Sequence, residues 1–201
     1  MANETPTLPV KTRYHALRRV AQGDDVAARS RAALKLVTPF VEQHEGFRDK
    51  AYWDVDGWAI GHGHKQLRDP VTGKMRPVRQ TDTMDKKTSS ALVRERLRAN
   101  AEAMYKDLTW SRTLSPGALA ALYDIAYNAG PSALSAAKSP ALNKSMLAPG
   151  ADRDAIVWRE LPTYRKSGGK IVPGLANRRA DAAVAFKPKT TSVPANLLVS
   201  R

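Results

Sequence analysis

The stretch that decides the fold reads Glu45-Gly-Phe-Arg-Asp-Lys-Ala-Tyr-Trp-Asp54, followed by Gly57-Trp-Ala-Ile-Gly-His-Gly-His64. An apolar helical run closes at Glu45, and the glycine after it is placed to end that helix as a C-terminal cap. Aromatic and polar residues then alternate between glycines, which predicts a small hairpin that begins near Asp54. Two carboxylates held by different elements beside a cleft are what glycosidic-bond hydrolysis requires.

Three blocks, in this order along the chain, carry a resemblance to a known family. The first holds Glu45-Gly46, Tyr52, Asp54, Gly57 and Trp58-Ala59-Ile60-Gly61-His62-Gly63-His64, the second runs from Leu119 to Asn128-Ala-Gly130, and the third holds Gly168-Gly169-Lys170, Gly174-Leu175 and Asn177-Arg178-Arg179. Together they resemble the phage-type lysozymes, the endolysins of glycoside hydrolase family 24. An ordered series of motifs over roughly residues 30–187 is far more specific than any single motif.

The resemblance implies an α+β fold that is mainly helical. A small β-hairpin lobe and a helical lobe would be joined by a long helix, with the substrate in the cleft between them. The implied reaction is hydrolysis of the β-1,4 bond between N-acetylmuramic acid and N-acetylglucosamine in peptidoglycan. Glu45 would be the general acid, and Asp54 the carboxylate that activates or steers the attacking water. No cofactor is implied.

Both carboxylates also have ordinary structural interpretations. An acid at the end of an apolar helix is commonly a solvated helix-end carboxylate, and an aspartate in a hairpin commonly caps the turn. Asp56 lies two residues after Asp54 and competes for that turn role. The distance from Glu45 along the chain matches the family at Asp54, which favours Asp54 as the second catalytic residue.

Ala59 marks a departure from the family pattern. The family usually has a threonine here, whose hydroxyl holds the nucleophilic water, and an alanine methyl group cannot do so. In one interpretation Asp56, His62 or a backbone group takes over the water. In the other, hydrolysis is slow, or the product forms by internal attack, as in a lytic transglycosylase.

The resemblance also assigns supporting roles outside the two carboxylates. His64 closes the hairpin, and its alternative role is a packed histidine that pins it. Arg178 matches an arginine that reaches the catalytic glutamate, and its alternative is a solvated helix arginine like Arg179. Asn128 either binds an N-acetyl group or caps its helix. The aromatic residues that could stack on sugar faces are Trp58, Trp53, Tyr52 and Tyr127, whereas Trp110 and Trp158 are assigned to packing.

Periodicity and capping signals predict the remaining elements. Residues 11–30 are expected as a short surface helix, and a second helix leads to Glu45, bent or split by Pro39. Residues 65–82 are expected as a polar loop and a long helix starts near Asp85. Further helices are predicted from Ser115-Pro116 to Gly130 and at about 132–138, 139–147, 152–161 and 174–186. The predicted organisation is a basic N-terminal extension (1–30), a lysozyme-like catalytic domain (31–187) and a flexible tail (188–201).

Composition limits the partners and the location. The net charge of +14 at pH 7 and the sequence pI of about 10.2 favour polyanions, among them anionic envelope polymers. The basic residues are scattered and accompany no nucleic-acid motif, so specific nucleic-acid binding is not expected. The chain has no cysteine, and no metal-ligand cluster, long apolar run or signal peptide is apparent. We expect a monomer that stays in the host cytoplasm until a membrane lesion releases it, or one packaged in the virion.

Two rival functions stay open. A lytic transglycosylase would act on the same bond with Glu45 and without the water. A virion-associated wall-binding protein would keep the fold with weak or no activity, and Ala59 is the feature that supports this possibility.

Overall fold

The computed structural model describes residues 10–188, with side chains from residue 25 onward. The first nine residues of the predicted N-terminal extension and nearly all of the predicted flexible tail therefore lie outside the described residues. The helices are α1 (Val10–Glu45), α2 (Lys86–Asp107), α3 (Pro116–Ala129), α4 (Pro140–Leu147), α5 (Arg153–Glu160) and α6 (Pro173–Phe186), with 3-10 turns η1 (Thr109–Thr113), η2 (Pro131–Leu134) and η3 (Leu161–Thr163). The strands are β1 (Arg48–Asp54), β2 (Gly57–Gly61), β3 (Gln66–Arg68), β4 (Met75–Pro77), β5 (Lys166–Ser167) and β6 (Lys170–Ile171).

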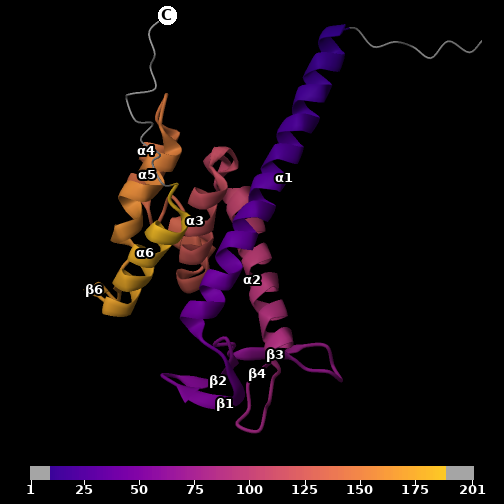
Figure 1. Cartoon of the computed structure of the whole chain (residues 1–201), viewed down its shortest axis with the longest axis vertical. Coiled ribbons are helices and arrows are strands. Elements are labelled where there is room, and N and C mark those ends of the chain that lie inside the picture. The colour runs from indigo at the N-terminus through magenta and orange to yellow at the C-terminus, as the bar shows by residue number, and fades with distance from the viewer. Residues whose placement is uncertain (1–9, 189–201) are drawn as a thin grey trace, which may run out of the picture.

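One continuous helix, α1, occupies the region where two were predicted. It runs through Pro39 without a break and extends well past the other helices toward its N-terminus (Figure 1). Pro39 lacks the N–H that would bond the carbonyl of Lys35, but both residues are exposed, so water can satisfy that carbonyl. The helix also passes unbroken through residue 30, where Ser30 lies 3.0 Å from the Tyr123 hydroxyl of α3.

The hairpin lobe starts with the antiparallel pair β1–β2, as predicted. Asp54 pairs with Gly57, so the turn consists of Val55 and Asp56. Asp54 therefore ends the first strand instead of beginning the hairpin, which starts at Arg48. This places the Asp54 carboxylate at the tip of the lobe, half exposed to solvent.

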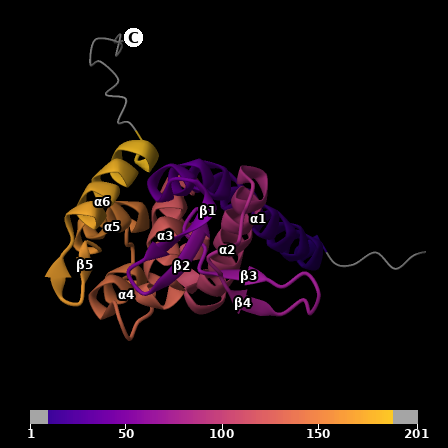
Figure 2. The same ribbon diagram turned by 90° about the horizontal axis from the view of Figure 1, so that it is seen from below.

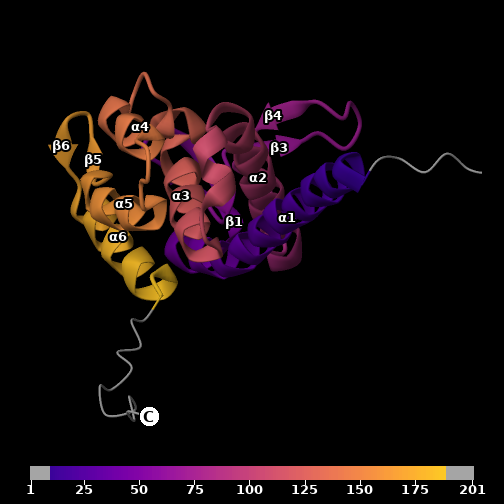
Figure 3. The same ribbon diagram turned by 90° about the horizontal axis from the view of Figure 1, so that it is seen from above.

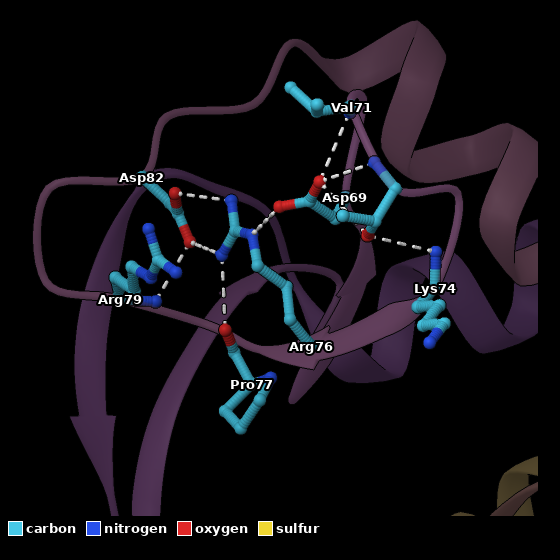
Figure 4. Close-up of polar contacts among 8 residues, drawn as sticks. Asp69, Val71, Lys74, Arg76, Pro77, Arg79 and Asp82 are labelled. Carbon is cyan, nitrogen blue, oxygen red and sulfur yellow. Dashed lines mark hydrogen bonds and ion pairs between the residues drawn. The ribbon is translucent and has the colours of Figure 1, made fainter.

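The predicted polar loop over residues 65–82 is wrong, because this segment contains a second hairpin, β3–β4. Arg76 holds it together: its Nη1 and Nη2 donate to the Asp82 carboxylate at 2.7 and 2.9 Å, and its Nε lies 3.7 Å from Asp69 (Figure 4). Asp69 in turn accepts from the Val71 N–H at 3.0 Å and shapes the connecting turn. These pairings depend on which side chains meet across a short hairpin, and periodicity did not reveal them.

Helix α2 connects the two lobes, as predicted, and starts where Asp85 accepts a hydrogen bond from the Thr88 N–H. The apolar residues that recur every three or four positions along this segment are all buried: Val93, Leu97, Ala101, Met104 and, just after the helix, Leu108. A small core of Ile60, Val78 and Met84 lies under the hairpins, and a large core fills the helical lobe. The predicted α+β, two-lobe architecture is confirmed.

Helix α3 is the centre of the helical lobe, with α1, α2 and the C-terminal helices around it (Figures 2 and 3). Every residue from 117 to 127 is buried, including the polar Asp124. The helix starts at Pro116 with a Ser115 cap and ends at Gly130, as predicted. The predicted helix at 132–138 is instead the four-residue turn η2, because Ser135 leaves the helical region with φ −64° and ψ 159°.

The last helices match their predicted positions, and α6 buries Ala182 and Phe186 while Leu175 stays partly exposed. In the described part of the chain, no helix is both long enough and apolar enough to cross a membrane.

Candidate active site

Glu45 is the last residue of α1, and its carboxylate lies between Arg178 of α6 and Gly63 of the hairpin lobe. Gly46 allows this abrupt end, because its φ of 66° is unfavourable for other residues and its N–H still bonds the Glu42 carbonyl at 3.1 Å. The Glu45 side chain is 24% exposed and its Oε1 accepts from Arg178 Nη1 at 2.7 Å. Its Oε2 lies 3.5 Å from where a Cβ on Gly63 would stand, so this oxygen faces the hairpin.

Arg178 continues from Glu45 into a buried ionic cluster. Its Nε donates to Asp124 Oδ1 at 2.8 Å, and Arg179 donates to the other oxygen of the same carboxylate. Asp124 is fully buried. Burial acts to lower the pKa of Arg178, but Asp124 and then Glu45 outweigh it, so the net shift is upward. Both guanidinium groups contact the Asp124 carboxylate, and this shared partner makes the burial of the two cations tolerable.

The prediction that Arg179 is solvated is wrong. Only 3% of it is exposed, and burial lowers its pKa despite the neighbouring Asp124. Arg179 also donates to the Oδ1 of Asn128, an exposed residue one position before the end of α3. The side-chain oxygen of Asn128 is therefore engaged by an arginine.

Asp54 belongs to an exposed charge group at the tip of the first hairpin. Lys65 Nζ lies 3.2 Å from Asp54 Oδ2 and also pairs with Asp56. The lysine lowers the pKa of the Asp56 carboxyl through a hydrogen bond and its charge. Lys65 thus bridges the two candidate acids for the water, a contact that the spacing of residues did not reveal.

Ala59 lies opposite Tyr52 in the β1–β2 ladder and is fully buried, so its methyl group does not line open solvent. His62, one of the predicted replacements for the missing hydroxyl, is 2% exposed. Asp56 remains the accessible candidate, although Lys65 holds it.

The two histidines of the hairpin converge on Ser89, near the start of α2. Its Oγ lies 2.7 Å from His62 Nδ1 and 3.0 Å from His64 Nε2. Burial lowers the pKa of both histidines. The chain at Gly61 approaches so closely that a Cβ there would lie 2.3 Å from Ser89 Oγ. This contact locks the hairpin onto α2 and agrees with the packed, pinning role of His64.

Among the aromatic residues, Trp53 and Trp58 are the accessible pair. Trp53 is 65% exposed and meets Trp58 edge to face at 5.6 Å. Tyr127 is buried beneath the guanidinium of Arg96, 4.4 Å from its ring centroid, and offers no open face. Trp110 is buried and donates to Asn143 at 3.0 Å, which agrees with a packing role.

A cavity of about 600 Å³ lies between the hairpins and α2. Its lining includes Gly63, His64, Lys65, Arg68 and Arg96 but not Glu45. Gly63 links the two features, because it lines the cavity and is also the hairpin-lobe residue that the Glu45 carboxylate approaches.

Sequence reasoning missed Asp124, Ser89 and Lys65. A signal existed for Asp124: it interrupts the apolar run Leu122-Tyr-Asp-Ile-Ala126, and a buried acid requires a cation. No comparable local signal marks Ser89, because its partners come from another element.

Comparisons with known proteins agree with this geometry. The family model described as phage lysozyme matches residues 42–182. The endolysin of Bacillus phage PZA is 32% identical over 164 residues, which cover 80% of this chain but only 55% of that endolysin. The chain therefore spans about half the length of this relative.

Solved structures share the fold at low identity. The muramidase domain of SpmX from Asticaccaulis excentricus matches with a TM-score of 0.55 and 21% identity, covering 79% of this chain and 97% of that domain. The active form of the P1 phage endolysin Lyz matches with a TM-score of 0.55 and 18% identity, covering 75% and 80%.

Proposed function

Because the chain belongs to the phage lysozyme family, we propose that it is an endolysin that hydrolyses the β-1,4 bond between N-acetylmuramic acid and N-acetylglucosamine in peptidoglycan. The 32% identity to a phage endolysin supports the same activity class. The proposal needs no cofactor.

The orientation of Glu45 carries the proposal. Arg178 holds one carboxylate oxygen at 2.7 Å, which leaves Oε2 facing Gly63 of the hairpin lobe. That oxygen can give a proton to the leaving sugar oxygen, the task of the acid in a glycosidase. A purely solvated helix-end glutamate would not be fixed in this way by a buried arginine.

Asp54 completes the proposed pair from the opposite lobe. Its half-exposed carboxylate at the end of β1 can steer a water or stabilise the positive charge that develops on the sugar. Lys65 would have to shift or share its contact as the glycan binds, because it lies 3.2 Å from Asp54.

Replacement of Glu45 by glutamine tests the assignment. Glu45→Gln keeps the hydrogen-bonding shape but cannot supply the proton, so wall lysis should fall by about 10²–10⁴-fold. Glu102→Gln, at an exposed position on α2, is the matched control and should lyse walls normally. Clearance of a peptidoglycan suspension measures both, with circular dichroism to check the fold. Near-normal lysis by Glu45→Gln would refute the role of Glu45.

A lytic transglycosylase is the second candidate, and the buried methyl group of Ala59 favours it. Internal attack by the substrate requires Glu45 but no water held by a hydroxyl at position 59. Mass spectrometry of the released muropeptides distinguishes the two, since 1,6-anhydro ends form only by internal attack. Absence of any release by the native protein would instead favour a wall-binding virion component.

The proposed setting is lysis of a bacterial host by a phage. The protein would accumulate in the host cytoplasm and reach the wall through a membrane lesion, or travel with the virion. Fractionation of infected cells before and after lysis onset would test this location.

A further inference from the structure

A second hollow lies away from the candidate active site, between α1 and α2. This groove, of about 430 Å³, is lined by Leu34, Thr38 and Pro39 and by four cations: Arg31, Lys35, Arg94 and Arg98. The two helices run side by side in Figures 1 and 3, and each contributes two of the cations. We call this feature the cationic groove.

Helix periodicity separates the cationic groove from the catalytic cleft. Arg94 and Arg98 are four residues apart, so both lie on one face of α2. Leu92, Glu95 and Arg96, by contrast, line the cavity between the hairpins and α2, on the other side of the helix. On α1, Lys35 precedes Glu45 by ten residues, about 15 Å at 1.5 Å per residue.

The charges of the cationic groove are unbalanced. All four cationic residues are exposed, and the lining contains no acid. Among residues 25–188, none of the four makes an ion pair. Like charges four residues apart on a helix repel each other, and here two such pairs face one another. An anion in the groove would remove this repulsion.

The residue types indicate which anion fits. Three of the cations are arginines, whose planar guanidinium groups bind phosphate oxygens in a bidentate manner. Leu34 and Pro39 add an apolar floor suited to the carbon backbone between phosphates. The geometry therefore favours a thin chain with spaced phosphate groups.

Other polyanions fit the cationic groove less well. Its lining has no aromatic residue, whereas proteins that bind single-stranded nucleic acid stack bases on aromatic side chains. A double helix is too wide to enter a space between two adjacent helices, and a flat bilayer surface cannot follow a concave groove.

We infer that the cationic groove binds a phosphodiester-linked polymer of the bacterial cell wall, at a site separate from the catalytic cleft. The choice of the wall as the source rests on the proposed function, while the phosphate chemistry rests on the groove alone. Binding about 15 Å along α1 from Glu45 would hold the enzyme on the wall while the cleft engages a glycan strand.

Charge-matched variants test the inference. Arg94→Gln with Arg98→Gln removes two groove charges, and Lys144→Gln with Lys187→Gln removes two exposed charges on α4 and after α6. Each protein is sedimented with two preparations of purified walls, one untreated and one in which hydrofluoric acid has cleaved the phosphodiesters. Short incubations in the cold keep the walls from being degraded during the measurement. Titration calorimetry with short-chain polyphosphate, a single-stranded oligonucleotide and anionic phospholipid vesicles gives the ligand class. None of these measurements requires turnover.

The expected result is about a tenfold loss of affinity for untreated walls and polyphosphate in the groove variant, with the control near native. Its thermal midpoint should equal or exceed the native value, because repulsion is relieved. Two results would overturn the proposal. One is an equal loss of wall affinity in the groove variant and the control variant, and the other is native protein that binds acid-treated walls as tightly as untreated walls. Tighter binding of the oligonucleotide or vesicles than of untreated walls would overturn the choice of polymer.

Discussion

The two candidate catalytic carboxylates are held in opposite ways. Glu45 ends a long helix and contacts Arg178, whose other partner is the fully buried Asp124. Asp54 ends a strand and, among residues 25–188, forms its ion pair with the exposed Lys65, which it shares with Asp56. Buried ion pairs depend strongly on every partner, whereas exposed pairs are weakened by solvent and salt. The buried cluster thus fixes the position of Glu45, whereas Asp54 has more freedom to adjust to a bound ligand.

Removal of the buried acid should have the largest effect. Asp124→Asn leaves Arg178 and Arg179 buried without their shared charge, so the free energy of unfolding should fall by about 3–5 kcal/mol. Asp181→Asn, at a carboxylate whose side chain is 60% exposed, is the control and should leave the unfolding midpoint unchanged. Urea unfolding followed by fluorescence measures both. Equal stability of the two variants would contradict the central role given to the cluster.

The two arginines allow a sharper test of how the core fixes Glu45. Arg178→Lys loses the planar group that reaches Glu45 and Asp124 together, so it should lose about 1–3 kcal/mol of stability and up to about a hundredfold in lysis rate. Arg179 contacts Asp124 but not Glu45. The Arg179→Lys variant should therefore lose stability while keeping most of its activity. Urea unfolding curves measure the stability of both variants, and clearance of a peptidoglycan suspension measures their lysis rates. Equal activity losses would show that the arginines act only on the fold.

The two buried histidines that converge on Ser89 predict a pH dependence. Burial lowers the pKa of His62 and His64 below 6.5, so the unfolded chain takes up protons first as the pH falls. Their stabilising contribution is therefore complete above pH 6.5 and is lost as the pH falls through the lowered values. Unfolding midpoints between pH 7.5 and 5 should decrease, and less so in His62→Gln. Lys74→Gln, at an exposed position of the same lobe, is the control and should keep the native slope, and a flat native profile would refute the account.

The smallest effect on stability is expected at the exposed carboxylate. Lys65→Gln removes a solvent-exposed pair, so the unfolding midpoint should stay within experimental error. The lysis rate should change by a few-fold, in either direction, because Asp54 loses its neighbouring cation. Lys74→Gln, elsewhere in the exposed part of the hairpin lobe, is the control. A large loss of stability in Lys65→Gln would show that the hairpin tip is as rigid as the core.

Local patterns were sufficient for most elements. The caps at Asp85 and Ser115, the stop at Gly46 and the buried stripe of α2 follow from residues a few positions apart. The errors arose where side-chain pairing and packing decide, since neither leaves a periodic pattern in the sequence. Arg76 and Asp82 tie residues 65–82 into a hairpin, and the packing of α1 onto α3 sustains one helix where two were expected.

The sequence by itself indicated the family and the two lobes and selected Glu45 as the candidate acid, because ordered motifs and helix periodicity are local properties. The family resemblance also assigned Arg178 to that glutamate, and the two side chains lie 2.7 Å apart. Only the tertiary structure showed that the buried Asp124 holds Arg178 in turn, because these residues are 54 positions apart and no spacing rule pairs them. Likewise, only packing brings Arg94 and Arg98 of α2 to face Arg31 and Lys35 of α1 across one groove. Charge and burial act through space, and the fold alone brings these side chains together.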